Sequence, residues 1–256
     1  MDDLSEKVQV NRKQDNECSR GFMPSDEKEF VHQIDILRKA SKDVLYLIEA
    51  GYPMKSATTF VGNHYLLSER QRLALARSLS IRECVLERKD KELSSDMLAG
   101  AKVHIDGFNT VISLEIAFSG NTLLKCMDGT IRDLAGLRGT YRIIDKTDRA
   151  VKAIRNVLSE NQVTQAVFYL DAPVSNSGRL KGRIADLFEG SGIEVSFQVI
   201  NDVDRVLMTK PCVITGDAII LDHCSSWYNL VKAAIEREIG DYPFVEIGEM
   251  TEGMKS

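Results

Sequence analysis

Four short runs of β-forming apolar residues in the second half of the chain each end at an aspartate and give way to a turn. These runs end at Asp106, Asp171, Asp202 to Asp204, and Asp217. Helical stretches separate them, and this alternation is typical of a largely parallel sheet joined by right-handed crossovers. Ligands gather at the carboxyl ends of the strands in such sheets. The pattern therefore predicts an α/β fold with an acidic site at one edge of its sheet.

The first third of the chain has a helical periodicity instead. Apolar residues between positions 30 and 48 recur at helical spacing, with Ser25 placed to cap that helix and Gly51 to end it. A second helix is expected over 56–62. Ser68 and Gln71 form a capping-box pattern for a third helix that runs toward residue 87.

Five segments follow from these patterns. We expect a flexible N-terminus at 1–23, an all-α domain at 24–90, a linker at 91–100, an α/β domain at 101–240 with helices flanking a mostly parallel sheet, and a tail at 241–256. Within the α/β domain, residues 123–134 are expected to form a β-hairpin around Asp128-Gly129, and Thr147 is expected to cap the helix that follows.

The composition is that of a soluble globular protein, with 43% hydrophobic and 28% charged residues in 256. A net charge of −5 argues against a protein that coats nucleic acid through bulk charge, although a local basic groove stays open. No apolar run reaches membrane-spanning length, and no signal-peptide core is present. The five cysteines include no CxxC pair, which argues against a disulfide framework or a zinc finger and favours a reduced, cytoplasmic setting.

The first strand end, Asp106-Gly107-Phe108-Asn109, combines a carboxylate, a glycine that allows close approach, and a carboxamide. The alternative is an ordinary strand-to-helix turn with Asn109 as the cap, because Asp, Gly and Asn are all common in turns. Glu115 follows inside an apolar helix, where it lies either on the solvent face or toward the strand ends.

The second strand end is followed by a loop rich in small hydroxyl residues. Ser175, Ser177 and Arg179 come shortly after Asp171. Backbone N–H groups at the start of a helix, together with an arginine, can bind a phosphate. The alternative is that Ser177 only caps the helix.

The remaining strand ends carry Asp202-Val203-Asp204 and Thr215-Gly216-Asp217. Crowded carboxylates repel one another, and a divalent cation is the usual partner of such a group. Asp-x-Asp is weakly specific, because one of its two acids can equally cap a helix.

Two groups of arginines are candidates for phosphate contacts. One is the helical stripe that includes Arg70, Arg72 and Arg77, and the other is Arg132, Arg138 and Arg142 near the hairpin. Such a stripe is more commonly a solvated helix face. Neither group is interleaved with aromatic residues in a way that predicts base stacking.

The stretches Ile105-Asp106-Gly107-Phe108-Asn109 and Thr215-Gly216-Asp217-Ala218-Ile219-Ile220 resemble the first and late acidic motifs of PIN-like nucleases, particularly the NYN branch. The layout is also similar to an uncharacterised prokaryotic family in which a helical domain with an arginine-glutamine-arginine stretch, here Arg70-Gln71-Arg72, precedes a PIN-like domain. The loop after Asp171 and the hairpin at 123–134 depart from the common PIN pattern.

The resemblance implies a metal-dependent phosphodiesterase that acts on RNA. Asp106 and Asn109 match the opening motif, Asp204 the middle acid, and Asp217 the late acid. We expect Asp106, Asp204 and Asp217 to hold Mg²⁺ or Mn²⁺, with Asp171 or Asp202 completing the shell. Glu115 is expected to orient a water or a second ion.

Two other interpretations stay open. The first is an inactive PIN-like fold that serves as an RNA-binding or adaptor protein. The second is a phosphatase of the haloacid-dehalogenase kind, which is disfavoured because Phe108 stands where such enzymes need an acid. The partners expected are RNA or another nucleic acid and no membrane. A monomer and a homo-oligomer are both compatible with the sequence.

Overall fold

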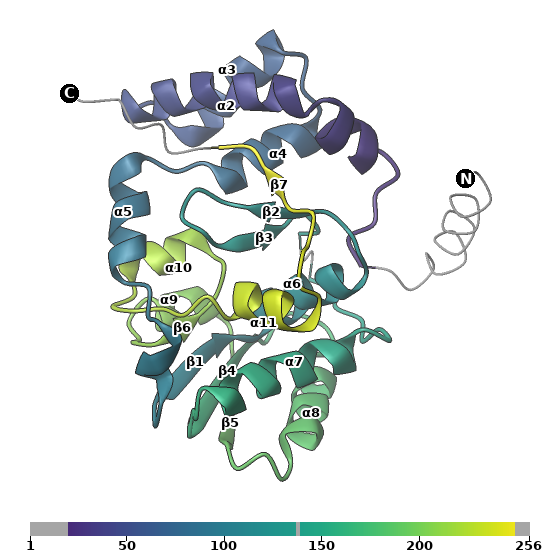
Figure 1. Ribbon diagram of the computed structural model, residues 1–256, viewed down its shortest axis with the longest axis vertical. Helices are drawn as coiled ribbons and strands as arrows, with labels where there is room; N and C mark the ends of the chain where they lie inside the picture. The colour runs from purple at the N-terminus through teal and green to yellow at the C-terminus, as the bar shows by residue number, and fades with distance from the viewer. Residues whose placement is uncertain (1–19, 137–138, 249–256) are drawn as a thin grey trace.

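The computed structural model describes residues 20–136 and 139–248. Helices flank a parallel sheet, and a further group of helices from the N-terminal part of the chain lies over one end of the molecule (Figure 1). The expected α/β fold with N-terminal helices is confirmed. None of the described helices is both long enough and apolar enough to cross a membrane.

The main sheet has four strands in the order β5-β4-β1-β6, and every neighbouring pair is parallel. Its strands are β1 (Lys102–Asp106), β4 (Gln165–Asp171), β5 (Glu194–Ile200) and β6 (Val213–Ile214). The chain builds outward from β1 through β4 to β5 and then returns to place β6 on the other side of β1. This reversal is a topological switch point, where ligands of open α/β sheets bind at the carboxyl ends of the strands.

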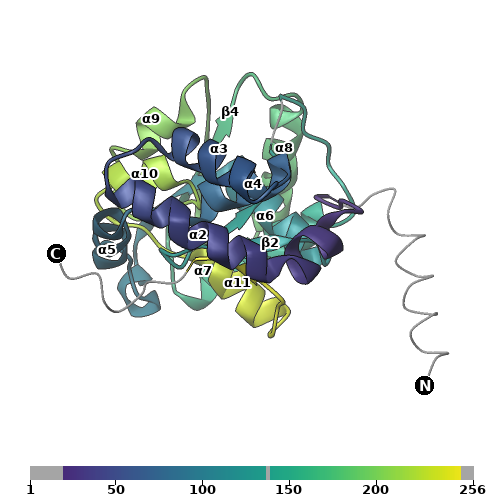
Figure 2. The same cartoon turned by 90° about the horizontal axis from the view of Figure 1, so that it is seen from above.

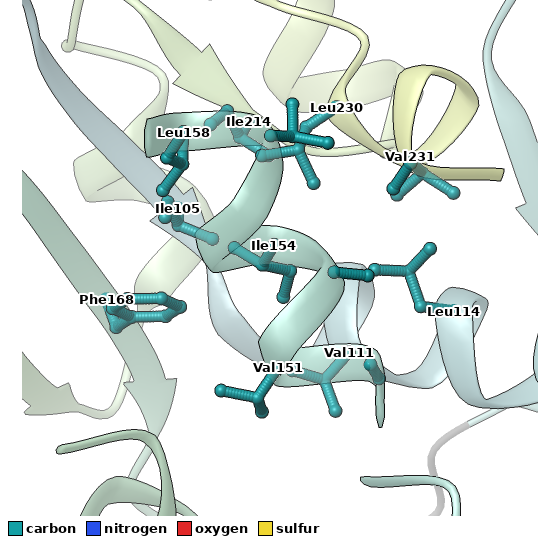
Figure 3. Close-up of a cluster of buried hydrophobic side chains, with 14 of the residues drawn as sticks. Ile105, Val111, Leu114, Val151, Ile154, Leu158, Phe168, Ile214, Leu230 and Val231 are labelled. Carbon is teal, nitrogen blue, oxygen red and sulfur yellow. The ribbon is translucent and has the colours of Figure 1, made fainter. Parts of the chain in front are cut away.

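One face of the sheet is covered by the four helices α6 (Gly107–Phe118), α7 (Thr147–Glu160), α8 (Ser177–Phe188) and α11 (Leu230–Glu238). Ile105, Phe168 and Ile214 point into this layer, where Figure 3 shows them packed against side chains of the helices. The residues that precede Phe168 and Ile214 point the opposite way. Val167 and Val213 pack with α9 (Val203–Leu207) and α10 (Ala218–His223). Burial on both faces explains why the central strand β4 is continuously apolar from Ala166 to Leu170.

The N-terminal helices pack together above a second, smaller sheet (Figures 1 and 2). They are the π-helix η2 (Glu27–His32), α2 (Ile34–Glu49), α3 (Met54–His64) and α4 (Glu69–Ser78). The next helix, α5 (Arg82–Asp90), contacts α10, and the 3₁₀ helix η3 (Ser95–Leu98) leads from it to β1. The smaller sheet has the order β3-β2-β7, with β2 (Leu123–Lys125), β3 (Ile131–Asp133) and β7 (Val245–Glu246). Leu124, Leu134 and Ile247 belong to the same apolar cluster as η2, α2, α3 and α4, so these four helices and the smaller sheet share one core.

Several local expectations are confirmed and others are corrected. The capping box of Ser68 and Gln71 is present, and the hairpin forms as β2 and β3. The helix that begins there ends at Ser78, because Leu79 adopts an extended backbone and turns its side chain into the core. Ser25 caps no helix. Thr147 is the first residue of α7 rather than its cap.

A buried ion cluster joins α5, the hairpin and α10. The Arg88 guanidinium, only 3% exposed, donates to Asp128 (2.7 Å) and to Asp222 (2.6 Å). Arg132 donates to the same Asp128 carboxylate (2.5 Å). Burial alone would raise the pKa of Asp128, but the two guanidinium groups hold it below its ordinary value. The hairpin is therefore fixed between the helices and the main sheet.

Gly107 lets the start of α6 lie directly against β4. A Cβ atom at this position would lie 2.6 Å from Leu170 Cδ2 and 2.9 Å from the Tyr169 carbonyl oxygen. The close approach expected from Asp106-Gly107 is thus present, and it brings the helix N-terminus to the carboxyl edge of the sheet.

We predict that Gly107→Ala lowers the free energy of unfolding by about 1–3 kcal/mol, because the new methyl group forces α6 away from β4. Gly182→Ala is the matched control. Nothing lies within 4 Å of a Cβ at this α8 position, so alanine should stabilise the helix by up to about 1 kcal/mol. Denaturant unfolding measures both. Equal effects of the two substitutions would contradict the close packing.

Candidate functional site

Asp106 ties the ends of β1 and β6 together. Its side chain is 7% exposed, caps α6 by accepting from the Asn109 N–H (3.4 Å), and accepts from the Thr215 hydroxyl (2.9 Å). Asn109 Oδ1 in turn accepts from the Gly216 N–H (2.8 Å). The first and last acidic strand ends therefore form one hydrogen-bonded unit at the switch point.

The loop after β6 is held from both sides. The Gly216 carbonyl accepts from Arg132 Nε (2.6 Å), which belongs to β3. Asp217 caps α10 by accepting from the Ile219 N–H (2.8 Å). A Cβ at position 216 would lie 3.1 Å from the Ile131 carbonyl oxygen, so glycine lets the loop pass close to the hairpin.

The five strand-end aspartates affect one another electrostatically. Burial, followed by the charges of Asp204 and Asp217, raises the pKa of Asp106 to about 7, although hydrogen bonds from Thr215 and Asn109 oppose the shift. Burial and the charges of Asp217, Asp171 and Asp202 raise the pKa of Asp204. Burial and the charge of Asp202 raise the pKa of Asp171. Asp106, Asp171 and Asp204, whose pKa values are raised, therefore lie at one acidic edge together with Asp202 and Asp217, whose charges contribute to those shifts.

The loop after β4 begins at the same edge. Ser175 and Arg179 are exposed, and the Ser175 hydroxyl accepts from the Tyr141 N–H (3.3 Å). The cap position of α8 is occupied by Asn176 in a left-handed conformation (φ 64°), with no side-chain capping bond. Ser177 is the first residue of the helix, so it does not cap it.

Glu115 lies elsewhere. It is nine residues beyond Asp106 on α6, about 13 Å along the helix axis, and is fully buried. It forms an ion pair with Arg20 (2.5 Å) and accepts from the Tyr141 hydroxyl (2.7 Å) and from Thr147. The expectation that it faces either solvent or the strand ends is wrong, because its partners hold the segment around residue 20 to α6 and α7.

The arginines of α4 make contacts within the molecule. Arg70 forms a two-bond pair with Asp26 (2.5 and 2.9 Å). Arg72 donates to the Leu67 carbonyl (3.0 Å), and Arg77 lies 3.5 Å from a carboxylate oxygen of Asp133. These contacts favour a structural role over phosphate binding. The Arg138 candidate lies outside the described residues.

Two residues that hold the acidic edge were not assigned this role from the sequence. In the sequence Thr215 is recognisable only as part of a strand end, and Arg132 only as one of several basic residues near the hairpin. Arg132 reaches Gly216 across 84 positions of the chain, and a single sequence gives no signal for so distant a contact.

The acidic edge can take part in cation binding without being a closed metal cage. Among the described residues no three His, Cys, Asp or Glu side chains are arranged to hold a metal ion. Asp106 and Asp217 each use an oxygen to cap a helix. Mg²⁺ is commonly bound by one or two carboxylates together with waters and substrate phosphates. The donor set fits a cation of that kind, shared with a phosphate.

Because the pKa of Asp106 is raised to about 7, the folded protein binds more protons than the unfolded chain between about pH 4 and 7. Stability without metal should therefore fall as pH rises through this window. We predict that Asp106→Asn raises the free energy of unfolding at pH 8, in a chelator, by about 1–3 kcal/mol, and that the gain vanishes near pH 4. Asp186→Asn, at an exposed position of α8, is the control. An Asp106→Asn variant that is no more stable at pH 8 than the parent would contradict the buried-charge account.

Two family models match successive parts of the chain. Residues 95–233 match a family model described as a domain of unknown function (DUF5616), and residues 36–91 match one described as a protein of unknown function (DUF434). An uncharacterized protein of Methanocaldococcus jannaschii, MJ0935, is 36% identical over 204 residues, which cover 78% of this chain and 97% of that protein. No solved structure matches the chain. The first model covers more than half of the chain, and the chain therefore belongs to the DUF5616 family.

Proposed function

We propose that this protein is a metal-dependent phosphodiesterase that cleaves RNA. One observation carries the proposal. Five carboxylates gather at the carboxyl edge of a parallel sheet, beside its switch point, and burial together with the charges of neighbouring aspartates raises the pKa values of three of them, Asp106, Asp171 and Asp204. Folding places like charges together here at an energetic cost, and a bound cation removes that cost.

In this proposal one or two of the Asp106, Asp204 and Asp217 carboxylates bind Mg²⁺ or Mn²⁺ directly, and the remaining acids, with Asp171 or Asp202, hold the waters of the ion. The ion supplies an activated water and stabilises charge on the scissile phosphate. The protein positions the metal-binding carboxylates. Thr215 and Asn109 orient the loop and the carboxylate at the junction of β1 and β6, and Arg132 fixes the same loop from behind.

The start of α8 is placed to bind a second phosphate of the RNA backbone. Ser175 and Arg179 are exposed in the segment that follows Asp171, beside the acids. Backbone N–H groups in the first turn of the helix and the Arg179 guanidinium can bind a neighbouring backbone phosphate. The preference for RNA rests on the resemblance of the opening and closing motifs to PIN-like nucleases of the NYN branch.

An inactive PIN-like protein that binds RNA as an adaptor is the second candidate. The observation in its favour is that no three described side chains are yet arranged around an ion. In that case the acids would be kept as a structural site. Because the same fold serves both candidates, only an assay of RNA cleavage distinguishes them.

A reduced, cytoplasmic setting suits either candidate. Among the described residues Cys84, Cys126, Cys212 and Cys224 form no disulfide, as is usual in such a compartment.

If the protein is an enzyme, substitution of its metal-binding aspartates should abolish RNA cleavage while the protein stays folded. Asp106→Asn or Asp217→Asn should reduce Mn²⁺-dependent cleavage of single-stranded or structured RNA by about a hundredfold or more, because each substitution removes a ligand charge. Cleavage, RNA binding and melting temperature are measured on the same preparations, with Asp186→Asn as the matched control. An unaltered protein that turns over no RNA with Mg²⁺ or Mn²⁺, while both variants still bind it, would establish the adaptor.

A further inference from the structure

One edge of the main sheet is open. β5 is the outermost strand beyond β4, and no described segment forms a ladder with its free side. Figure 1 shows it at the outside of the sheet with α8 beside it. The opposite edge is protected, because β6 exchanges hydrogen bonds with the segment around Trp227: the Val213 N–H donates to the Ser226 carbonyl and the Tyr228 N–H donates to the Val213 carbonyl.

β5 lacks the usual features that prevent edge pairing. It is seven residues long, contains no proline, and carries a single charge, Glu194, at its first position. Val199 is 41% exposed. Natural sheet edges are generally shortened, charged, bulged or covered, so a long and nearly uncharged edge indicates a surface that is paired in the assembled protein.

The hydrogen bonds to β4 show which residues face the free side. The Glu194 N–H donates to the Thr164 carbonyl (2.9 Å), and the Ile200 carbonyl accepts from the Ala172 N–H (2.8 Å). A parallel ladder uses alternate residues, so the even-numbered positions of β5 direct their backbone groups to β4. The N–H and C=O groups of Val195, Phe197 and Val199 therefore point outward.

We propose that β5 pairs antiparallel with β5 of a second copy, about a twofold axis at Phe197. In this register Phe197 faces Phe197, Val195 faces Val199, and Ser196 faces Gln198 of the second copy. The first two kinds of pair consist only of outward-pointing residues, and each exchanges both of its N–H···O bonds. Val195, Phe197 and Val199 meet apolar residues of the second copy, and each Glu194 lies opposite Ile200, so the two Glu194 side chains are at opposite ends of the joined strands.

The helix beside the edge fits the same arrangement. Lys181 of α8 lies over the Phe197 ring, with Nζ 5.6 Å from its centroid, so this side of α8 faces β5 and its edge. Gly178 and Ala185 lie on the same side, three residues before Lys181 and four after it. Both are exposed, and their small size lets the α8 helices of two copies approach across the joined sheet.

A second copy suits this edge because the strand is complementary to itself. Most soluble homo-oligomers are twofold dimers in which the same patch meets itself, and in the Phe197 register the apolar centre of β5, from Val195 to Val199, meets the same centre of the second copy. The proposal concerns only this edge and does not depend on the proposed chemistry.

Sedimentation velocity or light scattering over a wide range of protein concentration tests the proposal. The unaltered protein should reach twice the 28.6 kDa mass of one chain. Ser196 and Gln198 are exposed in the monomer and face each other across the proposed interface. Charged side chains can therefore be introduced at both positions without disturbing the core.

Ser196→Lys/Gln198→Lys sets like charges opposite each other at two places and should weaken the dimer by at least about tenfold. Ser196→Glu/Gln198→Lys is the matched control, because it sets opposite charges at the same places and should keep the dimer. Circular dichroism confirms that both variants fold. A monomeric unaltered protein would overturn the proposal, leaving the edge to a different chain, and equal dimerisation of the two variants would place the contact elsewhere.

Discussion

The arrangement of the acidic edge depends on the hydrogen bonds that join the ends of β1 and β6. Asp106 accepts from Thr215, and Asn109 accepts from the backbone of Gly216. These contacts bring together two strand ends that are more than a hundred residues apart in the sequence, and they bury a carboxylate whose pKa is raised to about 7. Such a carboxylate costs stability when it is charged, which is why we relate the arrangement to a ligand rather than to folding.

The remainder of the molecule supports this junction from two sides. Gly107 lets α6 start against β4, so the capping carboxylate of Asp106 stays at the edge. Arg132 holds the Gly216 carbonyl and also the buried Asp128, which Arg88 binds from α5. The N-terminal helices therefore reach the candidate site through the hairpin, and disturbing that ion cluster would also disturb the loop.

The sequence predicted what depends on short-range pattern. The apolar runs ending in aspartate indicated the parallel sheet and its acidic edge, and Ser68 with Gln71 indicated a helix start. The sequence did not predict contacts between residues that are far apart in the chain. The charge of Glu115 suggested a catalytic role, but in the structure its buried carboxylate pairs with Arg20 and accepts a hydrogen bond from Thr147, so its role is structural. The arginines of α4 suggested phosphate binding, but Asp26 pairs with Arg70. In both cases the partner lies far along the chain and no local pattern indicates it.

The central claim is that the strand-end carboxylates share a divalent cation. The most direct measurement is a crystal structure of the protein with Mn²⁺ and a short RNA, with the ion located by its anomalous scattering. The account predicts a peak beside Asp106, Asp204 and Asp217, with carboxylate oxygens at about 2.0–2.3 Å and at least one phosphate oxygen in the shell. Well-ordered crystals that show RNA but no Mn²⁺ at these aspartates, or Mn²⁺ only elsewhere, would contradict it.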